Sequence, residues 1–142
     1  MPIFTKEKIV NICTDIIEAA GMSRQNAKLI AELLAEANST GHDSHGIIRV
    51  PQYLAAIENN DILTNSNVNI LRESPLTAIV DGNWGFGQIT MSRAVEVGLE
   101  KARKSLAKPE IIITSLENPK TKKTCNLQKK SMSRAPRVIK LN

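Results

Sequence analysis

Both histidines of the chain, His42 and His45, lie in one short segment together with a carboxylate, a hydroxyl and an arginine. An imidazole can donate to, or exchange protons with, a substrate oxygen near neutral pH. The guanidinium of Arg49, four residues after His45, would reach the same side of a helix and could bind a carboxylate through two parallel hydrogen bonds. This combination suits a 2-hydroxy or 2-oxo acid, which presents a carboxylate beside an oxygen.

The same segment also has a purely structural interpretation. Asp43 or Ser44 would cap a following helix, His45 would fill the first turn of that helix, and Arg49 would be a surface charge. The spacing of the residues is compatible with both interpretations.

Three predicted helices surround this segment. The first follows an N-cap at Thr5 and stops at Gly21, the second follows an N-cap at Ser23 and stops at residues 39–41, and the third covers residues 48–58. Apolar residues at three- and four-residue spacing predict one buried face on each helix. These residues are Ile9, Ile12, Cys13, Ile16, Ile17 and Ala20; then Ala27, Ile30, Ala31, Leu34 and Ala37; then Val50, Tyr53, Leu54 and Ile57.

After the third helix the apolar period changes from that of a helix to that of a strand. Residues 68–71 and 77–80 are predicted strands, and the second is closed by Asp81-Gly82, a pair that suits positive backbone angles. A further helix follows residues 85–88, and residues 111–113 predict one more strand. The predicted apolar stripe of the further helix is Met91, Ala94, Val95, Gly98, Leu99 and Ala102. The fold class is therefore α+β, with an N-terminal helical layer and the start of an incomplete sheet.

Gly85-x-Gly87 does not fit a dinucleotide-binding loop. That loop, Gly-x-Gly-x-x-Gly, would need glycine at Thr90, where the third glycine allows close helix packing. We therefore predict a tight turn before a helix.

The amino-acid composition argues against nucleobase-binding, membrane-spanning and metal-binding proteins. The 142 residues, 42% of them apolar, suit one compact unit, and four aromatic residues are too few for nucleobase stacking. No apolar run is long enough to span a membrane, and no leader sequence is evident, so we expect a cytoplasmic protein. Cys13 and Cys125 lie far apart without metal-ligand spacing, so no metal site is expected.

The net charge of +5 is unevenly distributed along the sequence. Residues 1–103 contain nine Lys or Arg against twelve Asp or Glu, net −3, whereas residues 104–142 contain ten against two, net +8. An electrostatic field confined to one polar extension says little about the folded part, so we do not expect nucleic acid as a partner. Residues 105–142 are predicted to be a basic tail, poorly ordered or non-native.

Residues 37–46, with Arg49, Pro51 and Tyr53 after them, resemble the type 2 malate/L-lactate dehydrogenase family, which includes ureidoglycolate dehydrogenase. The helical hairpin, the Asp81-Gly82 turn, the Gly85-x-Gly87 segment and the helix after it follow in the same order as in that family. The resemblance covers about residues 3–104, and it identifies residues 1–104 as the N-terminal portion of such a domain.

The resemblance implies a dimeric fold, different from the doubly wound dinucleotide fold, that uses NAD or NADP to interconvert 2-hydroxy and 2-oxo acids. Ser44, His45 and Arg49 match family positions on the substrate side of the pocket. Arg49 is expected to anchor the carboxylate, and His45 to act as the catalytic group that orients or polarises the substrate. No cofactor-binding residue is assigned.

The sequence departs from the family at the catalytic proton-transfer histidine, which follows the strand after the fourth helix. No histidine occurs beyond His45. Loss of a general acid/base alone slows a reaction by about 10²- to 10⁴-fold. The resemblance therefore implies a truncated chain that is inactive alone, and the change of composition near Lys104 suggests a frameshift. The alternative is a non-catalytic interaction module whose basic tail binds polyanions.

Overall fold

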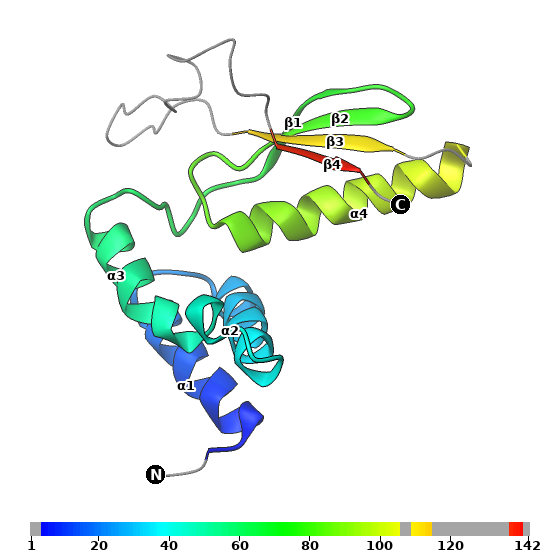
Figure 1. Ribbon diagram of the computed structural model, residues 1–142. Coiled ribbons are helices and arrows are strands. Elements are labelled where there is room, and N and C mark those ends of the chain that lie inside the picture. Colours follow the sequence, from blue (N-terminus) through cyan, green and yellow to red (C-terminus); the bar gives the residue numbers. More distant parts are fainter. Residues whose placement is uncertain (1–3, 106–108, 115–136, 141–142) are drawn as a thin grey trace. The chain divides into compact units, whose positions relative to one another are not determined.

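The computed structural model describes residues 4–105, 109–114 and 137–140 (Figure 1). The chain divides into two compact units, Met1–Asn65 and Ser66–Asn142. The expectation of a single compact unit is therefore wrong. In the first unit, helices bury their apolar faces against one another, whereas in the second a sheet is buried against its own helix, so each unit has a separate core.

The first unit is helical. Its helices are α1 (Lys6–Ala19), α2 (Arg24–Ser39) and α3 (Val50–Glu58), and two short 3-10 turns, η1 (Asp43–His45) and η2 (Ile47–Arg49), precede α3. The predicted caps are confirmed, because the hydroxyls of Thr5 and Ser23 accept hydrogen bonds from the backbone N–H groups of Lys8 and Asn26. Gly21, with φ of +96°, makes the turn from α1 to α2 in a conformation that favours glycine.

The predicted buried face is right for α2 and shifted for α1. Ala27, Ile30, Ala31 and Leu34 are buried as predicted, but Ile12 and Ile16 of α1 are exposed. Val10 and Thr14 are buried in α1 instead. Thr14 can be buried because its hydroxyl donates to the carbonyl oxygen of Val10 at 2.7 Å, which satisfies the polar group within the helix.

The second unit contains a four-stranded sheet in the order β1-β2-β3-β4. The strands are β1 (Asn69–Glu73), β2 (Thr77–Asp81), β3 (Glu110–Thr114) and β4 (Arg137–Lys140). The β1–β2 and β3–β4 pairs are antiparallel, and β2 pairs with β3 in parallel. A parallel pair needs a crossover connection, which here contains α4 (Gly87–Ser105), lying along the sheet in Figure 1.

The predicted strand at residues 111–113 is confirmed, since it forms the centre of β3. Both β3 and β4 fall within residues 105–142, and their backbones pair in the sheet. The rest of the predicted poorly ordered tail, residues 106–108, 115–136 and 141–142, lies outside the described residues.

The core of the second unit forms where α4 packs against β2 and β3. Its buried residues are Ala78, Val80, Ala94, Val97 and Ile111. The predicted stripe on α4 is partly wrong, because Met91 and Leu99 are exposed and Val97 is buried. The small residues Ala94 and Gly98 both lie on the buried face of α4, where small side chains permit close packing on the sheet.

The turn between β2 and α4 is tight, as predicted, but its strained positions differ from the prediction. Positive φ angles occur at Asn83 (44°) and Trp84 (57°), not at Gly82. Gly82 is needed for space, since a Cβ atom there would crowd the side chain of Thr90. The N–H of Gly85 donates to the carbonyl oxygen of Gly82 at 2.8 Å, and this bond closes the turn.

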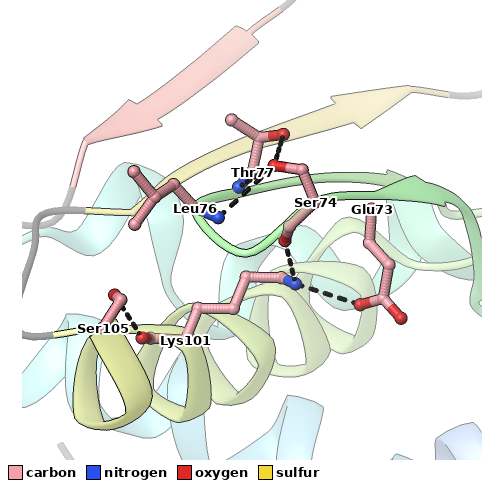
Figure 2. A network of polar contacts seen from close by, with 6 residues as sticks. All are labelled: Glu73, Ser74, Leu76, Thr77, Lys101 and Ser105. Atoms are coloured by element: carbon pink, nitrogen blue, oxygen red, sulfur yellow. Dashed lines mark hydrogen bonds and ion pairs between the residues drawn. The ribbon is translucent and has the colours of Figure 1, made fainter.

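A largely buried lysine ties the β1–β2 hairpin to α4 (Figure 2). The side chain of Lys101 is only 11% exposed, and its Nζ donates to Glu73 Oε2 at 3.0 Å and to the carbonyl oxygen of Ser74 at 2.7 Å. The Ser74 hydroxyl in turn accepts from the N–H of Thr77 at 3.0 Å, so the hairpin turn is internally bonded as well. The hairpin and the helix are thereby held together by polar contacts in addition to the apolar core.

Two negative findings apply to the described part of the chain. No helix there has both the length and the apolar character that a membrane crossing requires. No group of three or more His, Cys, Asp or Glu side chains in those residues is arranged to hold a metal ion.

Two substitutions on α2 test its assigned buried face. Ile30 is 0% exposed, so Ile30→Ala should lower the free energy of unfolding by about 2–5 kcal/mol through lost burial and a residual cavity. Leu33, 44% exposed, is the matched control, and Leu33→Ala should cost about 0.5 kcal/mol or less. Urea denaturation followed by circular dichroism measures both, and equal losses would contradict the assigned face.

Burial raises the pKa of the Cys13 thiol above its ordinary value, because the thiolate would lose its hydration. The neutral thiol therefore contributes stability below its unfolded-state pKa, and this contribution is lost as the pH rises through the folded-state pKa. In a Cys125→Ser background, alkylation of Cys13 at pH 8 should be much slower in the folded chain than in urea. Equal alkylation rates would show that the thiol is accessible.

Candidate functional site

The candidate site begins where α2 ends. The N–H of Gly41 donates to the carbonyl oxygen of Asn38 at 3.1 Å, and the N–H of His42 donates to that of Ala37 at 2.8 Å. Gly41 has φ of +80°, a conformation that L-residues with a side chain rarely adopt. The glycine thus lets the chain leave α2 abruptly and enter η1, which contains Ser44 and His45.

His45 and Arg49 do not share one helix, as the spacing had suggested. His45 ends η1 and Arg49 ends η2, and Gly46 between the two turns is extended, with φ of −89° and ψ of −150°. The prediction that they share one helix face is therefore wrong.

Ser44 connects the two side chains instead. Its hydroxyl lies 3.0 Å from His45 Nδ1, and its carbonyl oxygen accepts a hydrogen bond of 2.7 Å from Arg49 Nε. The structure thus brings Ser44, His45 and Arg49 together through direct contacts. The other histidine, His42, makes a separate contact, 3.2 Å from its Nδ1 to Thr40 Oγ1.

The capping interpretation of this segment is wrong. The N-cap of α3 is Arg49, which makes no side-chain capping bond, so neither Asp43 nor Ser44 caps that helix. Arg49 is half-buried, and its Nη1 donates to Gln52 Oε1 at 2.8 Å. Capping of α3 therefore does not account for the polar residues of η1.

The exposure of the three side chains leaves polar groups available to a small molecule. Ser44 and His45 are exposed. Within the described residues, neither His45 Nε2 nor Arg49 Nη2 makes a hydrogen bond. The site can therefore offer an imidazole nitrogen and one edge of a guanidinium to an anionic ligand.

Sequence reasoning missed Asn38 as part of this site. Its Oδ1 accepts from the N–H of Ile47 at 2.8 Å, and its Nδ2 donates to Asp43 Oδ1 at 2.6 Å. A Cβ atom at Gly46 would overlap the Asn38 side chain. The signal in the sequence was weak, because Asn38 lies among other polar residues at the end of α2, and only the folded chain brings Gly46 against it.

Comparison with known proteins finds similarity to dehydrogenases. A family model described as malate/L-lactate dehydrogenase matches residues 4–106. The L-sulfolactate dehydrogenase of Methanocaldococcus jannaschii is 34% identical over 101 residues, which are 71% of this chain and 29% of the relative. The malate dehydrogenase of Pyrococcus abyssi is 32% identical over 100 residues, 70% of this chain and 28% of the relative.

The structural comparison agrees. The solved structure of the Methanocaldococcus jannaschii sulfolactate dehydrogenase has a TM-score of 0.75 and 30% identity, with 82% of this chain and 34% of that chain covered. The match to the sequence relatives extends over less than a third of their length. This chain is therefore similar to one portion of those proteins.

Replacement of Gly46 tests the close packing on Asn38. Gly46→Ala should lower the free energy of unfolding by about 1–3 kcal/mol, because the added methyl group has no space. Gly87→Ala is the control: nothing lies within 4 Å of a Cβ atom there, and its φ is not positive, so a gain of about 0.4–1 kcal/mol is expected. Thermal and urea unfolding measure both variants, and a neutral Gly46→Ala would contradict the packing.

Proposed function

The chain belongs to the malate/L-lactate dehydrogenase family, and from this premise we propose that it supplies the substrate-binding segment of an oxidoreductase that interconverts 2-hydroxy and 2-oxo acids with NAD or NADP. The observation that carries the proposal is that both His45 and Arg49 contact Ser44. An imidazole and a guanidinium held by one residue are the two groups that the carboxylate and the neighbouring oxygen of such an acid require.

Arg49 is the proposed carboxylate anchor. Its Nε and Nη1 are held by Ser44 and Gln52, so the guanidinium plane is already oriented before a ligand arrives. Nη2 keeps both of its N–H groups and Nη1 keeps one, and these can donate to a carboxylate. A fixed plane loses little entropy on binding, which favours an anion of matching geometry.

His45 is proposed to orient and polarise the oxygen on C2 of the acid. With Nδ1 against the Ser44 hydroxyl, Nε2 is the ring atom that can donate to that oxygen. Oxidation removes a hydride from C2 and a proton from the hydroxyl, and the family resemblance assigns the proton to a different histidine. The sequence has no histidine after His45, so we propose that the chain alone is inactive.

The proposed nicotinamide cofactor would accept the hydride. The segment from Gly85 to Gly87 does not fit a phosphate-binding loop for it, because a Cβ atom at Gly85 would overlap Ser66 and no atom lies within 4 Å of a Cβ atom at Gly87. We therefore assign no residue to the cofactor and derive no step through it.

The proposed substrates are small 2-hydroxy acids of the kind named for the relatives. Malate and sulfolactate each combine a 2-hydroxy carboxylate with a second anionic group. The first group is the one that Arg49 and His45 are proposed to bind, so both acids should perturb the same two side chains.

Titration of the ¹⁵N-labelled full chain with L-malate tests this function. We expect shifts of the His45 ring and Arg49 Nε signals, and Arg49→Ala should weaken binding about 10- to 150-fold, the effect of losing a charge-assisted contact. Arg24→Ala is the control, because Arg24 lies in the same unit but pairs with Asp15 and Glu18 on α1. Absence of shifts in the parent chain, or equal weakening by both substitutions, would contradict the proposal.

A further inference from the structure

Asn38, on the last turn of α2, bonds to the first residue of each 3-10 turn. Its Nδ2 donates to Asp43, which begins η1, and its Oδ1 accepts from Ile47, which begins η2. We propose that Asn38 is a positioning residue that fixes the turn carrying Ser44 and His45 relative to the turn carrying Arg49. The part of this inference that concerns substrate rests on the proposed function, whereas the part that concerns geometry does not.

The chemistry of these two partners demands an amide. The Ile47 N–H is a donor and needs an acceptor, and the Asp43 carboxylate is an acceptor and needs a donor. Aspartate at position 38 would satisfy Ile47 but would bring a second carboxylate to the 2.6 Å contact with Asp43. Alanine would satisfy neither partner. Among side chains of this size, only asparagine serves both.

Gly46 adds a third constraint between the two bonded residues. Glycine has no Cβ atom, so the backbone of Gly46 can lie directly against the Asn38 amide, where any added Cβ atom would overlap it. The contacts at residues 43, 46 and 47 therefore bracket Ser44 and His45 from both sides. Rotation of η1 against η2 would have to break at least one of these contacts.

The Asn38 side chain is not needed to end α2. Carbonyl groups at that end accept from other hydroxyls: Ser39 Oγ donates to the carbonyl of Ala35, and Thr40 Oγ1 lies 3.0 Å from that of Glu36 and 3.1 Å from that of Ala37. Both hydrogen bonds of the Asn38 side chain run forward to the turns. Its role is therefore separable from helix termination.

The contact most sensitive to Asn38 should be the one between Arg49 Nε and the Ser44 carbonyl oxygen, because it joins the two turns directly. If η1 shifts against η2, this 2.7 Å bond is strained. The distance between the Arg49 guanidinium and the His45 imidazole is then no longer fixed. A change at Asn38 would then alter the positions of both ligand-binding groups, although Asn38 itself does not contact the ligand.

Four variants of the full ¹⁵N-labelled chain test the inference: Asn38→Ala, Asn38→Asp, the exchanged pair Asn38→Asp with Asp43→Asn, and the control Ser39→Ala. The exchanged pair restores one acceptor for Ile47 and one donor between positions 38 and 43. The control removes a side-chain hydrogen bond from the same end of α2 without touching either turn.

In Asn38→Ala and Asn38→Asp we expect the Arg49 Nε and His45 Nδ1 signals to move away from their positions in the parent chain. The Ile47 amide should exchange up to about tenfold faster in Asn38→Ala, the factor that loss of one hydrogen bond gives, and should stay protected in Asn38→Asp. The exchanged pair should return both side-chain signals to the parent positions, and Ser39→Ala should leave them unchanged.

Unmoved Arg49 and His45 signals in Asn38→Ala would overturn the inference, as would failure of the exchanged pair to restore them. If Asn38→Ala does not fold, Asn38→Asp and the exchanged pair make the same comparison. If the parent chain shows no response to L-malate, the proposed function fails, while restoration by the exchanged pair still supports positioning by Asn38.

Discussion

The hydrogen bond from the Ile47 N–H to Asn38 Oδ1 is the interaction on which the arrangement of the site depends. It joins the end of a helix to a segment nine residues later, across a turn that uses a left-handed glycine at position 41. Without a fixed point of this kind, two 3-10 turns of three residues each would have little to hold them, because such turns have few internal hydrogen bonds. The bond converts two weak local structures into one defined surface.

The helix that provides this bond is also the centre of the helical unit. Ala27, Ile30, Ala31 and Leu34 bury one side of α2, and the helix packs on α1 and contacts both 3-10 turns. A helix fixed by its apolar face can present a polar group at its end with little freedom, since its axis is already determined. Core packing and ligand-binding geometry are therefore linked through a single element, which explains how exposed side chains such as Ser44 and His45 can be placed accurately.

In the second unit, a two-stranded hairpin is attached to a helix. An isolated hairpin is marginally stable in water, and here the third strand and α4 supply the missing burial. Lys101 adds a polar tie at the hairpin turn, where Glu73 provides the charge and Ser74 a carbonyl oxygen (Figure 2). The lysine stem can be covered while its ammonium group stays paired, so burial of the side chain leaves no uncompensated charge.

The sequence by itself determined where the four α-helices and the first three strands lie, because caps such as Thr5 and Ser23, the glycine at position 21 and the change of apolar period are local signals. It did not predict β4 or the two 3-10 turns, which depend on contacts with other parts of the chain. It also determined the residue types of the candidate site, since Ser44, His45 and Arg49 were identifiable from their chemistry. Only the tertiary structure decided which side of α1 and α4 is buried, because that depends on which neighbour each helix meets. The same holds for the site: the contact of Asn38 with Asp43 and Ile47 depends on how the chain folds back after Gly41, and a spacing rule for one continuous helix cannot anticipate a break at Gly46.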